Sequence, residues 1–254
     1  MASMQVTWGI ALRSLRLIPR LPSTFIPSLV MPVFLTISFA GAFSGLVFIP
    51  GFPADKIIDW FIPMTTLQGA AFAGITTGMG AARDLENGFY DRFLVSPASR
   101  ASILAGPLVA SMLRAFIPVS LLLVAAVIAG AHFYGGLLGV MTLVIACLGI
   151  ALVSGAWAMA LALRFKTQQA APLMQMSVFI TVFLSTAQMP LNLLTGWLHA
   201  VARVNPMTNV LALARQGFLG EVTWAQTWPG LLSLGGMIAV TLLAAGRKMQ
   251  KVTP

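Results

Sequence analysis

Long apolar runs separated by short polar segments dominate the chain from residue 24 onward. A helix needs about 20 mostly apolar residues to cross a lipid bilayer. Six runs reach or approach that length: residues 24–49, 60–82, 103–130, 137–163, 170–190 and 227–246. The sequence contains no internal repeat and no polar stretch long enough for a soluble domain. The pattern therefore predicts an all-α integral membrane protein with six spans, forming one domain over residues 1–254.

A different pattern precedes the first run, in residues 4–20. One face of a helix there would carry Met4, Trp8, Ala11, Leu12 and Leu15, and another face would carry Arg13, Arg16 and Arg20. Tryptophan and leucine opposite arginines favour a helix that lies flat at the lipid interface. The same arginines also fit a simple topology signal, and the pattern leaves that alternative open.

Residues 191–220 are too polar and too interrupted to form a seventh span. Their apolar side chains repeat at helical spacing at Leu193, Leu194, Trp197, Leu198 and Val201. Asn205 is a good N-cap and Pro206 suits the first turn of a new helix, which Gly220 would end. We therefore expect two short amphipathic helices in the outer leaflet before the last span.

Composition supports a membrane location. The chain is 58% hydrophobic and only 8% charged, whereas a soluble domain is nearer a quarter charged. Its net charge of +9 is spread between the apolar runs, which argues against a nucleic-acid partner, because nucleic-acid-binding proteins cluster basic residues on one face. Cys147 is the only cysteine, so it can form no internal disulfide. The apolar run after Arg20 is far longer than a secretory signal core and predicts a retained anchor.

The basic residues predict which connections face the cytoplasm. With both termini inside, the inner side holds Arg13, Arg16, Arg20, Arg83, Arg92, Arg100, Arg164, Lys166, Arg247, Lys248 and Lys251. The outer side holds only Lys56, Arg203 and Arg215. The positive-inside rule therefore predicts a multi-pass protein of the cell (inner or plasma) membrane with both termini in the cytoplasm.

Arg114 is the basic residue that falls within a predicted span. We favour an interpretation in which its long side chain reaches the inner interface by snorkelling. A counter-charge for an anionic substrate and a link between helices are the alternatives.

The connection between the second and third runs concentrates charge of both signs, in Arg83, Asp84, Glu86, Asp91 and Arg92. Gly88 is unfavourable inside a helix, and Ser96 with Pro97 is typical of a new helix start, the start of the third span. A short helix with Phe89 and Phe93 on one face fits between these breaks. Aromatic residues ringed by charge suit a contact surface, but an ordinary cytoplasmic loop has a similar composition.

The stretch RDLENGFYDRFLVSPASRASILAGPLVASML resembles the signature of the ABC type-2 exporter permeases, most closely those of the daunorubicin-resistance type. The residues that match it between the second and third spans are Glu86, Gly88, Leu94, Pro97 and Arg100. A second stretch, VNPMTNVLALARQGF, is similar to the Asn-Pro element before the family's last span, with Asn205, Pro206 and Arg215 in register. Gly106 and Pro107 depart from the family, which often has a lysine there, and we expect the proline to kink the start of the third span.

The resemblance implies that the charged connection is a cytoplasmic coupling helix, held in a groove of a separate ATPase subunit. The implied apolar anchors are Phe89, Phe93 and Leu94, and the implied polar contacts are Glu86, Asp91, Arg92 and Arg100. It also implies two copies of the ABC ATPase subunit, which would hold ATP and magnesium, and a second permease copy or a sibling permease. This chain itself would bind no cofactor.

The residues give no sign of catalysis. The chain has no Gly-Lys pair and therefore no Walker A loop for phosphate, so ATP hydrolysis belongs to another polypeptide and this chain is not an enzyme. One cysteine and the two distant histidines, His132 and His199, make no metal site. The acidic residues lie in loops or at span ends, which disfavours a proton relay in the membrane.

Large flexible side chains in the spans suggest a path for cargo. Phe34, Phe39, Phe43, Met174, Phe179 and Phe183 could line an adaptable apolar path, or they could face lipid. Gln68, Gln175 and Gln188 are the polar candidates for substrate contact. Glycines and alanines in the second and fourth spans indicate close helix packing.

We therefore expect an exporter subunit that moves hydrophobic or amphiphilic small molecules, such as a drug, an antibiotic or a lipid, out of the cytoplasm or the inner leaflet. Membrane lipids would surround it. Two alternatives stay open: an ion-coupled secondary carrier or channel, and a non-transporting membrane scaffold or immunity protein.

Overall fold

The computed structural model describes residues 2–16, 22–88, 99–220 and 222–251, and in those residues every regular element is helical. The helices are α1 (Ala2–Arg16), α2 (Pro22–Ala42), α3 (Ile57–Glu86), α5 (Arg100–Ile128), α6 (Gly136–Phe165), α7 (Ala171–Phe183), α8 (Gly196–Val204), α9 (Pro206–Leu219) and α10 (Trp224–Gln250). Short 3₁₀ turns, η2 (Ser44–Phe48), η3 (Gln168–Ala170) and η4 (Leu191–Leu193), join some of them. The all-α prediction is confirmed.

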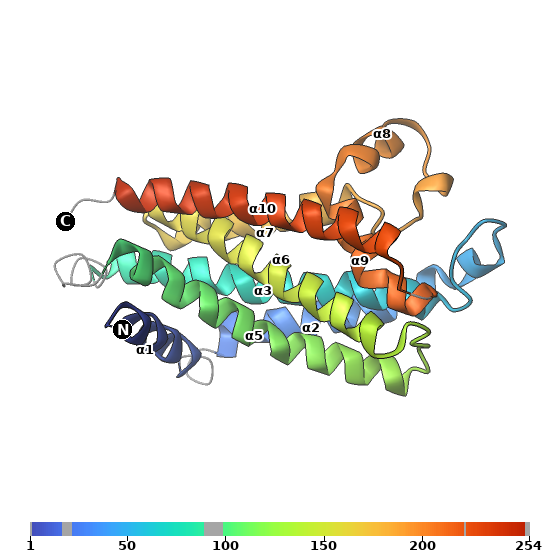
Figure 1. Ribbon diagram of the computed structural model, residues 1–254, viewed down its shortest axis with the longest axis horizontal. Coiled ribbons are helices and arrows are strands. Elements are labelled where there is room, and N and C mark those ends of the chain that lie inside the picture. The colour runs from blue at the N-terminus through green and yellow to red at the C-terminus, as the bar shows by residue number, and fades with distance from the viewer. Residues whose placement is uncertain (1, 17–21, 89–98, 221, 252–254) are drawn as a thin grey trace.

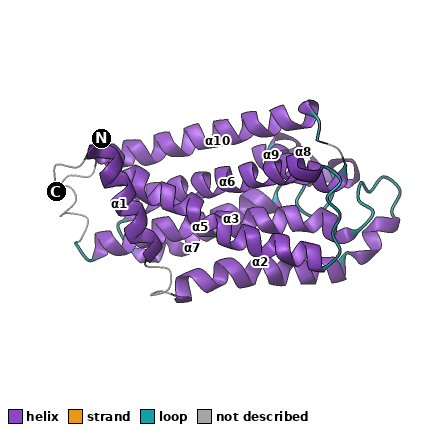
Figure 2. Ribbon diagram, turned by 60° about the horizontal axis from the view of Figure 1, so that its bottom comes forward, coloured by secondary structure: helices purple, strands orange, loops and turns teal. Residues whose placement is uncertain are grey.

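The long helices run side by side along one axis of an elongated bundle (Figure 1). Both chain ends lie at the same end of this bundle, which we call the terminal end, and the turn from α6 to α7 is there too. α8, α9 and the η2 turn lie at the opposite, distal end. α1 lies across the bundle at the terminal end (Figure 2).

α3 is the central helix, and its residues from Asp59 to Ile75 are all buried. Small residues let neighbouring backbones approach it closely. A side chain at Gly74 would collide with Ser154 and Ala151 of α6, and one at Gly78 would collide with Ala158. This bears out the packing role predicted for the small residues of the second and fourth runs.

Three of the described helices, α5, α6 and α10, are long and apolar enough to cross a membrane by length and composition. The fifth apolar run, 170–190, is only partly helical, because α7 ends at Phe183 and the chain continues in turns. A single helix through that run was therefore a wrong prediction. The residues that follow the helix, LSTAQMP, contain neither glycine nor proline before Pro190, so no local stop signal marks the end of the helix.

The two short helices predicted before the last run are present as α8 and α9. Asn205 caps α9 by accepting a hydrogen bond from the backbone N–H of Met207 at 2.9 Å, and Pro206 is the first helical residue. α9 ends at Leu219, and Gly220 follows it as predicted. Most of α9 is buried against α3, α6 and α10, so it is a core element of the distal end.

α9 and α6 touch through backbone. The Cα of Gly139 in α6 faces Gly217 in α9 so closely that a side chain at either glycine would strike the other's backbone. The backbone N–H of Gly135, just before α6, also donates to the carbonyl oxygen of Gly217 at 2.9 Å.

α1 packs on α5 at Gly106, one of the two residues that depart from the family pattern. A Cβ placed on Gly106 would lie 2.7 Å from the Cβ of Ile10, so the glycine makes room for α1. α5 is assigned as one uninterrupted helix from Arg100 through Pro107 to Ile128. Met4 and Trp8 on the predicted lipid face of α1 are exposed, but Ala11, which was predicted on the same face, is buried together with Ile10.

Candidate functional site

The end of α3 and the start of α5, which flank the predicted coupling segment, lie at the terminal end of the bundle (Figure 1). The segment's residues Phe89, Asp91, Arg92, Phe93, Leu94 and Pro97 fall outside the described residues. The flanking residues Glu86, Gly88 and Arg100 are described. Gly88 has a positive φ of 66° directly after α3, a conformation that glycine adopts without strain. The helix break predicted there is confirmed.

The start of α5 differs from the prediction. Ser99 caps the helix by accepting a hydrogen bond from the backbone N–H of Ser102, and helical geometry begins at Arg100. The third-span helix was predicted to start at Ser96 and Pro97, which was wrong. A second serine with the same capping chemistry follows a few residues later, and sequence reasoning chose the first.

Glu86, the last residue of α3, holds the turn between α6 and α7. Its carboxylate accepts hydrogen bonds from Thr167 Oγ1 at 2.7 Å, from the backbone N–H of Gln168 at 3.0 Å and from Gln168 Nε2 at 2.6 Å. The hydroxyl of Thr167, followed by the donors of Gln168, lowers the pKa of Glu86, because each bond favours the charged carboxylate. Glu86 therefore ties α3 to the start of α7.

Arg100 makes a similar tie at the start of α5. Its Nη1 donates to the carbonyl oxygens of Met249 at 3.1 Å and Gln250 at 2.8 Å, which are the last residues of α10. A helix end leaves such carbonyls without partners in the helix, and a cation there also complements the helix dipole. The predicted contact of Glu86 and Arg100 with an ATPase stays a prediction, because their described partners lie within the chain.

An ion pair makes the third tie. Arg13 of α1 binds Asp84 of α3 through two hydrogen bonds, from Nη1 to Oδ2 at 2.9 Å and from Nη2 to Oδ1 at 3.1 Å. Sequence reasoning placed Arg13 on the polar face of α1 but missed Asp84 as its partner. Together with the bonds of Glu86 and Arg100, this pair joins the end of α3 and the start of α5 to α1, to the turn before α7 and to the end of α10.

A second cluster of polar contacts joins α7 and α9 through Asn205. Its Nδ2 donates to the carbonyl oxygens of Thr181 at 2.8 Å and Leu184 at 2.9 Å, at the end of α7. Its Oδ1 caps α9 at the same time. One amide thus serves the end of one helix and the beginning of another, which explains why this type of side chain stands there.

Arg215 of α9 completes this cluster and is buried, with 2% of its surface exposed. Its guanidinium donates to three carbonyl oxygens: Nε to Trp60 at 3.0 Å, Nη1 to Thr186 at 2.7 Å and Nη2 to Ala187 at 2.8 Å. It also stacks on the Trp60 ring. Arg215 was predicted to lie with the charges of the outer side, on a short amphipathic helix. Its side of the membrane stays a prediction, but its side chain is buried, because α9 inserts between other helices.

Arg114 also lies in the interior, with 7% of its surface exposed. Its Nη2 donates to Thr77 Oγ1 of α3 at 2.6 Å, and its Nε donates to the carbonyl oxygen of Ala110 at 3.3 Å. The side chain therefore links α5 to α3. The favoured interpretation, snorkelling to the interface, is wrong, and a link between helices is what the structure contains.

The residues predicted to line a cargo path mostly pack against one another. The Phe39 ring lies 5.2 Å from that of Phe61 and 6.3 Å from that of Phe183, measured between centroids, and Phe179 lies 5.3 Å from Phe72. Phe43 joins the same group. They form an aromatic contact between α2, α3 and α7. Their role toward a substrate stays a prediction.

The remaining path residues are dispersed. Phe34 and Gln175 are exposed, Met174 is buried and Gln188 is half-buried. Gln68 is fully buried, and its amide nitrogen and oxygen have no hydrogen-bond partner. Among the predicted polar candidates, Gln68 therefore retains unused hydrogen-bonding capacity in the interior.

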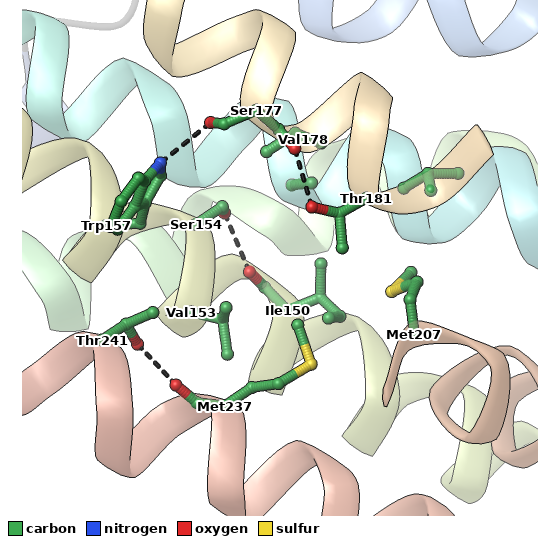
Figure 3. Close-up of a pocket in the computed structure, with 12 residues that line it drawn as sticks. Ile150, Val153, Ser154, Trp157, Ser177, Val178, Thr181, Met207, Met237 and Thr241 are labelled. Atoms are coloured by element: carbon green, nitrogen blue, oxygen red, sulfur yellow. Dashed lines mark hydrogen bonds between the residues drawn. The ribbon is translucent and has the colours of Figure 1, made fainter. Parts of the chain in front are cut away.

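A pocket of about 200 Å³ lies on the opposite face of α7 (Figure 3). α6, α7 and α10 form most of its wall, with Ala71 of α3 and Met207 of α9. None of the predicted path residues lines it. Sequence reasoning missed this pocket. Ser154 of α6 lines it, but the small residues of that helix were interpreted only as packing residues.

Comparison with known proteins places these features in context. The family profile described as ABC-2 family transporter protein matches residues 53–247. The chain is also similar to the daunorubicin resistance ABC transporter permease protein DrrB1 of Streptomyces coeruleorubidus, with 22% identity over 230 residues. That alignment covers 90% of this chain and 80% of the relative.

Proposed function

The chain belongs to the ABC-2 family of transporter proteins, and from this premise we propose that it is the permease subunit of an ATP-driven exporter. The similar protein DrrB1 is named for daunorubicin resistance, which supports a drug or another amphiphilic small molecule as the cargo. The apolar composition of the chain supports the same class, because the helices offer such a molecule few polar contacts. Transport would carry it out of the cytoplasm or the inner leaflet.

Six crossings of the cell membrane, by α2, α3, α5, α6, α7 and α10, are part of this proposal, with both termini in the cytoplasm. The common position of the two chain ends supports it (Figure 1). So do the basic residues in the last turns of α1, α6 and α10, among them Arg13, Arg164 and Arg247, since cytoplasmic connections carry the excess of lysine and arginine.

The energy would come from a separate ABC ATPase, in two copies that hold ATP and magnesium, acting on a pair of permeases. The segment between α3 and α5 would be the part that the ATPase grips. The observation that carries this proposal is the set of three ties described above: Arg13 with Asp84, Glu86 with Gln168, and Arg100 with the end of α10. Because these ties fasten both flanks of the segment to other helices, a displacement of the segment would reach α1, α7 and α10 together.

Co-purification tests the ATPase contact. The double change Phe89→Asp and Phe93→Asp puts charge on the apolar face predicted to enter the ATPase groove, and we expect the ATPase to be lost from the purified complex. Phe48→Asp is the matched control, because Phe48 is 85% exposed at the distal end and should leave the complex intact. Thermal unfolding and gel filtration of the permease should be unchanged in both variants. Retention of the ATPase by the double variant would contradict the proposal.

Transport itself needs a separate measurement. In vesicles that contain the permease and its ATPase, we expect cargo movement to require ATP hydrolysis. Cargo movement by the permease alone on an ion gradient would instead support a secondary carrier.

Topology is tested with a membrane-impermeant maleimide. A cysteine at position 96 (Ser96→Cys) should react only from the cytoplasmic side, and the native Cys147 is fully buried and should not interfere. Labelling from outside the cell would reverse the proposed orientation.

A further inference from the structure

The pocket beside α7 has a wall without free hydrogen-bond donors. Four hydroxyl groups line it, from Ser154, Ser177, Thr181 and Thr241. Each donates to a carbonyl oxygen of its own helix: to Ile150 at 2.8 Å, Met174 at 2.8 Å, Ser177 at 2.7 Å and Met237 at 2.9 Å, in that order. The indole N–H of Trp157 donates to Ser177 Oγ at 2.8 Å. Figure 3 draws the bonds of Ser154, Thr181, Thr241 and Trp157 as dashed lines.

The rest of the wall is apolar. Val153, Met207 and Met237 point toward the space from three different helices (Figure 3). Methionine side chains adapt their shape to an irregular apolar guest. A ligand whose polar groups are acceptors would lose its bonds to water and find no free donor in the wall, and burying such groups without partners is unfavourable. The pocket therefore suits a hydrocarbon.

The size of the pocket narrows the choice further. Pockets that enclose a whole drug-sized molecule usually measure about 300–1,000 Å³, and this one measures about 200 Å³. It is also only partly enclosed. A part of a larger molecule that enters from one side, such as one alkyl chain, fits this volume better than a complete cargo molecule does.

The surroundings indicate where such a chain would come from. Trp157 lines the pocket and is 37% exposed, and the same helices that form the wall expose Ile180 and Val240. α6 and α10 are among the helices apolar enough to cross a membrane. The pocket thus belongs to an apolar surface that bilayer lipid would cover.

From this geometry we infer that the pocket holds one acyl chain of a bilayer phospholipid, inserted between α6, α7 and α10. The chain fills a space that the protein side chains leave open, and it packs α7 against α10. α7 is the short helix whose end is bound by Asn205 at the start of α9. The lipid would therefore support the helix that links α9 to the rest of the bundle. This site requires that the helices are embedded in a membrane, but it does not depend on an ATPase partner.

Photolabelling tests the inference. The purified protein is reconstituted in phosphatidylcholine vesicles that contain a phosphatidylcholine with a diazirine in the middle of one acyl chain. After irradiation, mass spectrometry of peptides locates the adducts. We expect adducts on residues of the pocket as well as on the exposed faces of the helices. Their absence from the pocket would overturn the inference.

Two variants that fill the pocket, and a control variant at an adjacent exposed position, make the test specific. Thr241→Phe fills the pocket from α10, and Val178→Phe fills it from α7, so we expect several-fold fewer pocket adducts in each. Val240→Phe adds the same ring one residue away, where the side chain is 68% exposed, and should leave pocket labelling unchanged. If a folded filling variant keeps the labelling of the unmodified chain, the inference fails.

A competition experiment separates lipid from cargo. Excess daunorubicin, the drug in the name of the similar permease, should leave the pocket adducts unchanged if the pocket belongs to lipid. Displacement of the adducts by the drug would assign the pocket to cargo and overturn the lipid assignment. Co-purification of the ATPase is a different measurement, so either result leaves the proposed function to its own test.

Discussion

The guanidinium carbon of Arg215 lies 3.7 Å from the centroid of the Trp60 ring. In the same place the arginine donates to the carbonyl oxygens of Thr186 and Ala187, in the turns that follow α7. In a membrane, irregular backbone is tolerated only when its polar groups find partners inside the protein. Arg215 and Asn205 supply those partners where α7 stops early, which gives the Asn-Pro element a structural explanation.

Replacing Arg215 with methionine should destabilise the protein strongly. The buried carbonyl oxygens of Thr186 and Ala187, in the turns after α7, would lose this donor, and each such group costs about 1–3 kcal/mol. Arg215→Lys should recover only part of the loss, because an ammonium group lacks the planar fork that reaches several acceptors. Thermal unfolding in detergent measures both. Arg203→Met, on an exposed part of α8, is the control, and equal stability of the lysine variant and the unmodified chain would contradict the role of the fork.

Replacing Asn205 with aspartate should destabilise the protein, although the two side chains have nearly the same size. Asn205→Asp keeps the acceptor for the Met207 N–H but replaces two donors with an oxygen that faces the carbonyls of Thr181 and Leu184. We expect Asn205→Asp to be at least as destabilising as Asn205→Ala, which loses a cap worth about 1 kcal/mol. Denaturant unfolding compares them. The same change at Asn192, an exposed residue that donates to Gly51, should have little effect, and a neutral Asn205→Asp would refute the double role.

The tie made by Glu86 should weaken in acid. Its pKa is lowered in the folded chain, so its contribution is complete above the ordinary pKa of glutamate and is lost as the pH falls through the lowered value. We expect the backbone amide of Gln168 to lose hydrogen-exchange protection over that range, after correction for intrinsic exchange rates. Glu86→Gln should lower the protection at neutral pH and remove its pH dependence. A pH dependence that persists in this variant would point to another group.

Gly106 should tolerate no side chain. In Gly106→Ala the new Cβ would press on Ile10 and on the carbonyl oxygen of Thr7, and such overpacking costs about 1–3 kcal/mol. Gly80 of α3 has open space around it, so Gly80→Ala should instead stabilise its helix by up to about 1 kcal/mol. Thermal unfolding shows whether each variant is more or less stable than the unmodified chain. Hydrogen exchange of the α1 amides shows whether α1 detaches from α5. Equal effects of the two alanines would remove this contact as the reason for the glycine.

The sequence predicted structure well where the signal is local. Asn205, Pro206 and Gly220 set the limits of α9 through groups within a turn of each limit, and Gly88 ended α3 in the same way. These features depend on hydrogen bonds and backbone angles of neighbouring residues. A single sequence contains that information.

Predictions failed where the partner is distant in the chain. Arg215 reaches Trp60 across 155 positions, and Arg114 reaches Thr77 across 37. Charge and hydropathy indicate that such arginines are unusual in an apolar segment, but they do not identify what receives the hydrogen bonds. The end of α7 was missed for a related reason, since the carbonyl oxygens of the turn after it are bound by Arg215, which is distant in the chain.

The glycine contact between α6 and α9 has a consequence for movement. Where Gly139 meets Gly217, no side chain stands between the two backbones, so there is little that can rotate or slide, and we expect the pair to behave as one rigid body. The junction of α9 with α7 is different, because the side chains of Asn205 and Arg215 make its hydrogen bonds. Side chains can release and re-form such bonds while both backbones stay folded. If the distal end opens, we expect α7 and α9 to separate before α6 and α9 do.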